Sequence, residues 1–198
     1  TRFGNMLSNL GNPQNDYPII HIAGTKGKGS TAAILSSILQ RAGYRVGLYT
    51  SPHLITVRER VRINDVDITK ERFAELISLI VSVPDSVRIG EHAAFRTVFE
   101  HLTALALLNF SKSKVDIAII ETGLGGRLDS TVVLDPILSI LTPIGLDHMA
   151  LLGDTVEEIA VEKSYIIKRG VPAVSAPQVP SVLRVFSKRA QNVGAELM

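Results

Sequence analysis

The sequence predicts a three-layer α/β fold with a mostly parallel sheet. Short apolar strands alternate with amphipathic helices along the 198 residues, and a glycine-rich turn joins the first strand to the first long helix. Strands that are rich in β-branched residues and bounded by Gly or Pro are typical of a parallel sheet with both faces buried. No internal repeat or low-complexity segment interrupts this pattern.

The first half of the chain predicts a short helix, a βαβ unit, an edge hairpin and a capped helix. These elements are expected at residues 3–10, 19–23, 30–42, 45–50, 58–63 with 66–68, and 70–83. The helix 30–42 has an apolar stripe, made of Ile34, Leu35, Ile38, Leu39 and Ala42. A right-handed crossover should place strands 19–23 and 45–50 in one parallel sheet. Thr69 is the expected cap of the last helix.

The second half predicts further strands and helices of the same kind. They are expected at 97–110, 115–120, 137–141, 155–168, 173–174 and 181–190, with a polar loop at 85–94 and the start of a strand at 194–198. Thr155 and Glu158 form a capping box in front of the helix 155–168.

Composition excludes several classes of protein. A net charge of +2, no run of Lys and Arg and few aromatic residues argue against a nucleic-acid binder. The absence of cysteine excludes disulfides and thiolate catalysis, and it fits a reducing compartment. The sequence contains no stretch of 18 apolar residues, so it predicts no membrane-spanning helix. We therefore expect a cytoplasmic protein. With no initiator Met and no signal peptide, we also expect a fragment cut at both ends.

The turn at residues 24–30 has the features of a phosphate-binding loop. It follows an apolar strand and opens a helix, so its backbone N–H groups point at one spot near the positive end of the helix dipole. Lys28 can reach the β- and γ-phosphates, and the hydroxyl of Ser30 or Thr31 can ligate Mg²⁺. The spacing is unusual because Gly29 separates the lysine from the serine. The alternative is a lysine- and glycine-rich turn with no role in phosphate binding.

Polar side chains at the carboxyl ends of other strands should meet this turn, because the ends of parallel strands converge on one crevice. They are Ser51, His53, Glu121, Asp147 and His148. A carboxylate that closes an apolar strand is where nucleotide-binding proteins hold their metal, so Glu121 is the strongest candidate for a magnesium ligand.

Each of these residues also has an alternative interpretation. Glu121 could pair only with Arg127, Ser51 could cap the turn before Pro52, and His148 could be a hydrogen-bonded structural histidine. The glycine-rich segment 123–129 could be a flexible connection. The pattern around Lys163, on a helix, predicts a solvated surface position.

Six motifs occur together in one order, and they resemble the folylpolyglutamate synthase / dihydrofolate synthase family of the Mur ligase superfamily. They are His21–Ser30, Thr50–Leu54, Glu59–Ile63, Glu121–Asp129, Gly145–His148 and Ile159–Lys163. The resemblance runs from about residue 6 to the end and accounts for the unusual spacing of the phosphate turn. It implies one ATP-binding P-loop domain over residues 1–198, incomplete at its C-terminus and without the family's C-terminal glutamate-ligase domain.

The resemblance also implies the site residues. ATP would bind Gly24, Thr25, Lys26, Gly27, Lys28, Gly29, Ser30 and Thr31. Magnesium would be held by Ser30, Ser51, Glu121, His148 and Lys163, the last as a carbamate formed with CO₂; Lys28, His148 and Lys163 would be catalytic. The pterin or folate would contact Thr97, Val98, Phe99, Glu100, Arg127, Leu128 and Asp129, and the loop with Ser51, Pro52 and His53 would close over it. Carbamate formation needs a neutral amine, so partial burial of Lys163 would help it.

The implied reaction is an ATP-dependent ligation. ATP would phosphorylate a carboxylate of dihydropteroate or folate, and the amine of L-glutamate would attack the acyl phosphate to form an amide. We expect a monomer, and the fragment alone is expected to be inactive. Departures from the family pattern at Val132, Pro143 and Ser164-Tyr165 make Lys163 a less certain assignment than Glu121.

Two other functions remain open from the sequence. One is another Mur-type ligase, which adds amino acids to peptidoglycan precursors or cyanophycin. The other is a non-catalytic nucleotide-binding fragment. The sequence does not decide between dihydrofolate synthesis, polyglutamylation or both.

Overall fold

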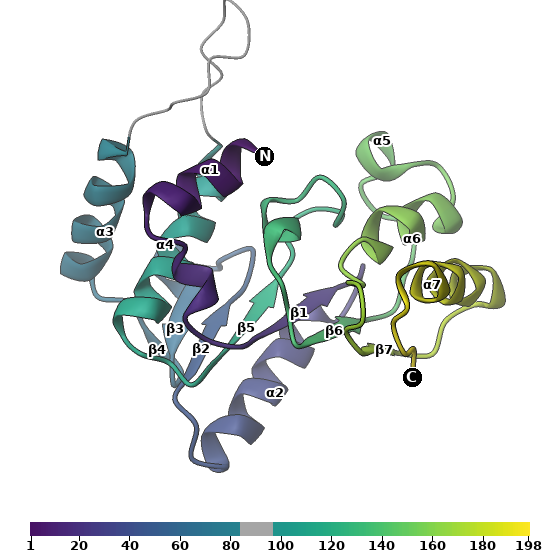
Figure 1. Ribbon diagram of the computed structural model, residues 1–198, viewed down its shortest axis with the longest axis horizontal. Helices are drawn as coiled ribbons and strands as arrows, with labels where there is room; N and C mark the ends of the chain where they lie inside the picture. Colours follow the sequence, from purple (N-terminus) through teal and green to yellow (C-terminus); the bar gives the residue numbers. More distant parts are fainter. Residues whose placement is uncertain (84–96) are drawn as a thin grey trace, which may run out of the picture.

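The computed structural model describes residues 1–83 and 97–198, which form a seven-stranded sheet covered by helices on both faces (Figure 1). The strands are β1 (Ile19–Ala23), β2 (Val46–Tyr49), β3 (Val61–Ile63), β4 (Val66–Asp67), β5 (Ile117–Glu121), β6 (Leu138–Leu141) and β7 (Ala173–Ser175). Their order across the sheet is β4-β3-β2-β5-β1-β6-β7. The neighbours from β2 to β7 pair in parallel, while β3 and β4 form an antiparallel hairpin at one edge. The predicted α/β fold with a mostly parallel sheet is confirmed.

The helices alternate with these strands as the sequence predicted. They are α1 (Arg2–Asn9), α2 (Lys28–Arg41), α3 (Lys70–Ser82), α4 (Val98–Lys112), α5 (Met149–Leu152), α6 (Val156–Ser164) and α7 (Pro180–Val193). Short 3₁₀ helices cover Pro13–Asn15, Val57–Arg60 and Ser130–Val133. The hydroxyls of Thr69 and Thr155 cap α3 and α6, as expected.

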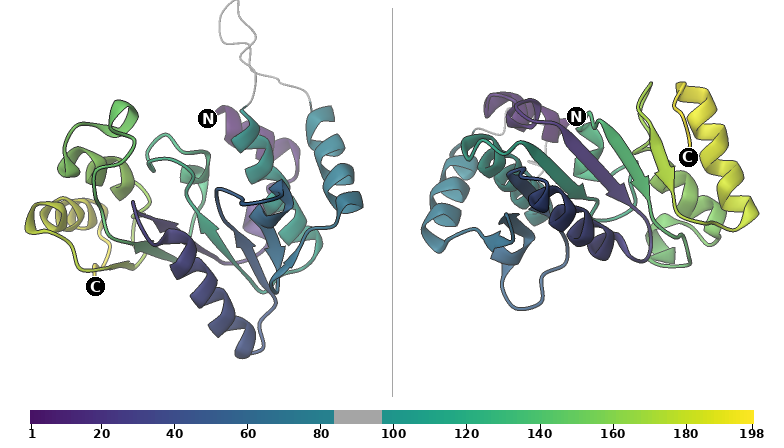
Figure 2. Two further views of the ribbon diagram at one scale, coloured as in Figure 1. Left: turned by 180° about the vertical axis from the view of Figure 1, so that it is seen from behind. Right: turned by 90° about the horizontal axis from the view of Figure 1, so that it is seen from below.

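Different helices pack on the two faces of the sheet. Even-numbered β1 residues such as Ile20 and Ile22 pack with Ala32 of α2, whereas Ile19 belongs to the core under α1, α3 and α4. A third cluster joins β6 and β7 to α6 and α7 and includes the fully buried Phe186. Figure 2 shows α2 alone in front of its part of the sheet, with α7 beyond the β7 edge.

Three local predictions were wrong in detail. Only part of the predicted apolar stripe of α2 faces the sheet: Leu35 and Leu39 pack against it beside the buried Ala32, whereas Ile34 and Ile38 are exposed. The edge strand begins at Val61, since a 3₁₀ turn occupies the residues before it. The helix expected to reach residue 168 ends at Ser164.

The ends of other predicted segments also differ. The helix Met149–Leu152 was not predicted. The strand expected at 194–198 is present only as an isolated parallel bridge between Leu197 and Ala173. The polar loop predicted at 85–94 lies outside the described residues. Among the helices that the structure describes, none combines the length and apolarity needed to cross a bilayer.

Candidate functional site

The predicted phosphate turn lies at the carboxyl edge of the sheet and is fastened to the loop after β6. The backbone N–H groups of Thr25 and Lys26 donate to the carbonyl of Pro143 over 3.0 and 3.3 Å, and the Thr25 hydroxyl donates to the carbonyl of Gly145. A Cβ atom on Gly24 would lie 1.8 Å from the Thr142 hydroxyl, so only glycine fits there. These contacts hold the turn in one place under the start of α2.

The N-terminus of α2 has the character of an anion site. Gly27 is its N-cap in the left-handed conformation, and no side chain within the described residues caps the first turn. The first N–H groups of a 14-residue helix therefore point outward at its positive end. Lys28, at the first helical position, adds a positive charge beside these donors, and phosphate binding at the turn stays a prediction.

Glu121 faces this turn across the edge of the sheet. Its Oε1 atom lies 3.7 Å from Lys28 Nζ, and its Oε2 atom accepts a 3.2 Å hydrogen bond from the N–H of Ser51. The side chain is 3% exposed. Burial raises the pKa of Glu121, while the Ser51 N–H and the Lys28 ammonium lower it. The sequence prediction that these three residues meet is confirmed, and the alternative pairing of Glu121 with Arg127 is wrong because Arg127 pairs with Glu162.

The backbone of the loop after β2 is held by Glu59, while the side chains at its tip are exposed. The carboxylate of Glu59 accepts hydrogen bonds from the N–H groups of Leu54, Ile55 and Thr56. The Leu54 N–H is the largest cause of the lowered pKa of Glu59. His53 is exposed, and its Nδ1 atom accepts a 3.0 Å bond from Arg60. Leu54 and Ile55 are each 92% exposed, so the tip presents apolar side chains outward.

Asp147 and His148 lie on a half-exposed loop before α5. His148 Nε2 is 3.7 Å from Asp147 Oδ2, and the His148 N–H donates to the same carboxylate. Among the described residues, no three His, Cys, Asp or Glu side chains form a cluster that could hold a metal by themselves. A role for His148 as a magnesium ligand therefore stays a prediction.

Lys163 is buried, which contradicts the solvated position that its local pattern predicted. It is 5% exposed, on α6. Burial lowers its pKa to about 8; the charge of Lys28 lowers it further, whereas Asp147 and Asp129 oppose the shift. A Cβ atom on Gly126 would lie 2.6 Å from the Glu162 carbonyl, so the glycine-rich loop rests against the backbone of α6 beside Lys163. The local pattern could not show this burial, because a distant loop produces it.

The glycine-rich loop also lines a pocket of about 740 Å³. The other walls come from the start of α1, the start of α4, the 3₁₀ helix at 130–133 and α5. Of the predicted substrate residues, six line this pocket: Thr97, Phe99, Glu100, Arg127, Leu128 and Asp129. Val98 is exposed and is not part of the pocket lining, and neither is the segment Ser51–His53.

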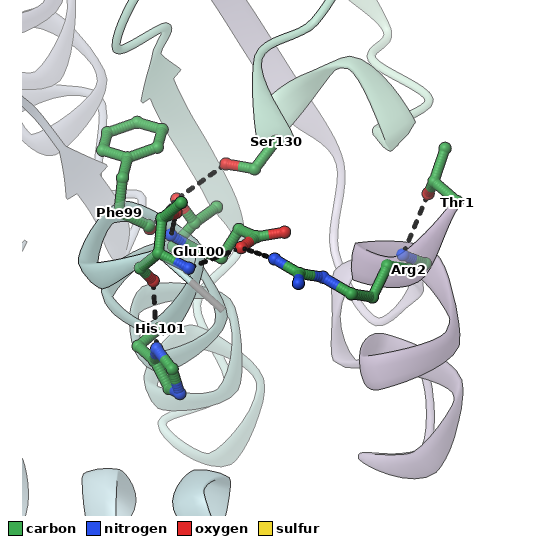
Figure 3. Close-up of polar contacts among 9 residues, drawn as sticks. Thr1, Arg2, Phe99, Glu100, His101 and Ser130 are labelled. Carbon is green, nitrogen blue, oxygen red and sulfur yellow. Dashed lines mark hydrogen bonds and ion pairs between the residues drawn. The ribbon is translucent and has the colours of Figure 1, made fainter. Parts of the chain in front are cut away.

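The wall formed by α1 was missed from the sequence. Arg2 Nη2 donates to Glu100 Oε2 over 2.7 Å, and Figure 3 shows the guanidinium reaching from α1 to the first turn of α4. The same carboxylate accepts from the N–H of Thr97 and completes the capping box of α4. The contact joins segments 98 residues apart, and no local pattern signals it.

Known proteins resemble this chain over most of its length. Residues 22–176 match the family model of the Mur ligase middle domain. The dihydrofolate synthase/folylpolyglutamate synthase of Bacillus subtilis is 44% identical over 198 residues, which cover 98% of this chain and 45% of that protein. The folylpolyglutamate synthase of Lacticaseibacillus casei is 38% identical and is likewise covered to 45%.

Solved structures agree with these similarities. An FPGS–AMPPCP–folate complex superposes with a TM-score of 0.93 at 38% identity, over 100% of this chain and 48% of that one. An FPGS–AMPPCP complex gives a TM-score of 0.94. The resemblance proposed from the motifs is confirmed. The chain spans less than half the length of the relatives it matches.

The lowered pKa of Lys163 has a consequence for stability. Between about pH 8 and 10.5 the unfolded chain binds more protons at this lysine than the folded chain, so its contribution to the stability of the folded state rises with pH. Below pH 8 the buried ammonium costs about 3 kcal/mol. We expect Lys163→Met to be more stable than the wild type at neutral pH in bicarbonate-free buffer. The gain should shrink as the pH rises toward 10.

Urea unfolding of both proteins at a series of pH values measures this difference. Lys112→Met, at an exposed lysine of α4, is the matched control and should show no such pH dependence. A stability difference for Lys163→Met that stays constant from neutral to high pH would contradict the burial argument.

Proposed function

The chain belongs to the Mur ligase family through its middle domain, and we propose that it is the ATP-binding part of a ligase that joins L-glutamate to dihydropteroate or folate. The names of the relatives from Bacillus subtilis and Lacticaseibacillus casei support this choice. An ATP-analogue and folate complex among the similar structures also supports it. A cytoplasmic location and a monomeric state remain predictions.

One observation carries the proposal: Lys28 and Glu121 face each other, 3.7 Å apart, at the carboxyl edge of the sheet. The ammonium suits phosphate oxygens and the carboxylate suits a cation, so a magnesium nucleotide bound beside them would satisfy both charges. The contact joins the start of α2 to the end of β5, and the Ser51 N–H fixes the carboxylate from the loop after β2.

The residues of the crevice fit ATP and magnesium. The uncapped start of α2 offers N–H donors to phosphate oxygens, and Lys28 adds a positive charge. Magnesium in nucleotide sites uses one or two carboxylates, with phosphate oxygens and water completing its shell. Glu121 supplies one such carboxylate, with Ser30, Ser51 and His148 as the other proposed ligands. When bound, the metal would neutralise charge on the transferring phosphoryl group.

The chain's own residues would act mainly by placement and charge. Lys28 would hold the β- and γ-phosphates and stabilise the charge that develops as the γ-phosphoryl group moves to the substrate carboxylate. Glu121 would bind the cation next to those phosphates. The glutamate amine would then attack the acyl phosphate, forming the amide and releasing phosphate.

The 740 Å³ pocket is the proposed site for the pterin end of the substrate. Its walls include the ring of Phe99 and the apolar residues Leu124 and Leu152, which suit a flat heteroaromatic ring. Glu100 and Arg127 place charged groups at the same pocket, where they can orient the polar edge of such a ring. The exposed tip at Leu54 and Ile55 offers apolar surface that could cover a bound substrate.

Lys163 is proposed to carry a carbamate. Its neutral amine would attack CO₂, forming an N–C bond and releasing one proton to solvent, and the product is a carboxylate that can bind a cation. A pKa of about 8 supports this step because roughly half of the amine is neutral near pH 8. The modification would also replace a buried positive charge near Lys28 with a negative one.

The proposed function is tested by glutamate- and pteroate-dependent ATP hydrolysis in the full-length protein. Glu121→Gln keeps the shape of the side chain and removes its charge, so we expect kcat to fall by about 10²–10³-fold. Glu75→Gln, at an exposed glutamate of α3, is the matched control and should behave as wild type. Unchanged turnover in Glu121→Gln would remove the catalytic interpretation. Stimulation by peptidoglycan precursors where pteroate has no effect would instead favour another Mur-type ligase.

The carbamate is tested by ¹³C NMR of the native protein in ¹³C-bicarbonate near pH 8. We expect a carbamate resonance that is absent in Lys163→Met and present in Lys112→Met. If the wild type shows no such signal at saturating bicarbonate, Lys163 acts as an amine or not at all.

A further inference from the structure

A buried chain of hydrogen bonds runs from β1 to the glycine-rich loop, and the proposed reaction does not use its first member. His21 is fully buried, and its Nε2 atom lies 2.8 Å from the hydroxyl of Thr131. That hydroxyl donates to Asp129 Oδ1. Asp129 Oδ2 accepts 3.0 Å hydrogen bonds from the N–H groups of Gly123 and Leu124. Three side chains thus connect the strand before the phosphate turn to the start of the loop.

The Asp129 carboxylate holds the two ends of the glycine-rich loop 123–129 together by hydrogen bonds. Its Oδ1 atom also accepts from the N–H of Thr131, over 2.9 Å, so four donors converge on one carboxylate. Burial raises the pKa of Asp129, and all four donors oppose that shift because they favour the ionised form. The loop contains several glycines and has little stiffness of its own, so this carboxylate is its main internal fastening.

The direction of the hydrogen bonds assigns the tautomer of His21. The Thr131 hydroxyl gives its only proton to Asp129, which also accepts from three backbone N–H groups. The Thr131 oxygen must then accept, and His21 Nε2 must carry the imidazole proton. Burial, with a smaller contribution from the charge of Lys168, lowers the pKa of His21 to about 3, so the ring is neutral at neutral pH. The Nδ1 atom has no partner within the described part of the chain, which agrees with an unprotonated nitrogen.

We propose that His21 is a positioning residue: through Thr131 it orients the Asp129 carboxylate, and through Asp129 it holds the loop that lines the substrate pocket. The part of this inference that concerns the substrate rests on the proposed function, whereas the hydrogen-bond network does not. Gly126, in the same loop, packs against the backbone at Glu162 and Lys163. A displaced loop would therefore disturb both the pocket wall and the helix that carries the buried lysine.

The tautomer can be measured directly in the wild-type protein. Long-range ¹H–¹⁵N NMR of the imidazole rings should show His21 protonated at Nε2 only, with no titration between about pH 5 and 8. His101, which is half-buried on α4 with its Nδ1 atom 3.0 Å from the Thr97 carbonyl oxygen, serves as the internal comparison. A proton on Nδ1, or a charged ring at neutral pH, would overturn the proposed direction of the network.

A pair of variants tests the role of the donor. His21→Leu removes it, whereas the amide of His21→Gln can still donate to Thr131. In His21→Leu we expect hydrogen exchange at the Gly123 and Leu124 amides to accelerate at least about tenfold. The Kd for pteroate should rise about tenfold or more, with the Kd for ATP changed less than about twofold, because the phosphate turn makes none of these bonds. His21→Gln should restore most of both effects, and His101→Leu, the matched control, should show neither.

The outcomes separate this inference from the proposed function. Unchanged exchange at Gly123 and Leu124 in His21→Leu would overturn the positioning role whatever the substrate is. Equal losses of ATP and pteroate affinity, without rescue by His21→Gln, would also overturn it in favour of general destabilisation. If the wild type binds no pteroate, the proposed function fails while the exchange measurement still decides the role of His21. If His21→Leu fails to fold, Thr131→Val is the alternative, because it removes the hydroxyl that links His21 to Asp129. It is expected to give the same exchange result.

Discussion

A buried carboxylate opposite a lysine, at the edge where parallel strands end, is the constraint on which this site depends. Glu121 is almost fully withdrawn from water, and Lys28 and the Ser51 N–H are its polar partners in the described residues. A charge in such a place is costly unless opposite charge and hydrogen bonds compensate it. The contact therefore requires the phosphate turn, the end of β5 and the loop after β2 to stay together.

The topology of the sheet produces this meeting. β5 lies between β1 and β2, and its register places Glu121 beside Ile22 of β1, two residues before the phosphate turn. The sequence could predict the strands, the turn and the carboxylate, because each has a local pattern and parallel strand ends converge. It could not predict that β5 separates β1 from β2, since strand order is decided by packing between distant segments. The burial of Lys163 and the Arg127–Glu162 pair depend on such packing too.

The same limit explains the error at α2. Ile34 and Ile38 fit an apolar stripe on a helical wheel, yet they are exposed, while Leu35 and Leu39 of the same stripe pack against the sheet beside Ala32. A helix that begins at a phosphate turn has its rotation set by that turn, since Lys28 must face Glu121. The turn thus decides which part of the apolar stripe packs on the sheet and which part is exposed.

Two carboxylates connect the walls of the pocket to the rest of the fold. Glu100 completes the capping box at the start of α4 and also binds Arg2 of α1, so one residue caps a helix and joins two pocket walls. Asp129 fastens the glycine-rich loop and, through Thr131 and His21, ties it to β1. The strand that leads to the phosphate turn therefore also supports the glycine-rich loop that lines the pocket.

The most direct test of this arrangement is a crystal structure with Mn²⁺ and a non-hydrolysable ATP analogue, located by the anomalous scattering of manganese. The account predicts a manganese peak bonded to the Glu121 carboxylate and to a phosphate oxygen that Lys28 also contacts. A nucleotide bound away from residues 24–31, or a manganese peak remote from Glu121, would contradict it.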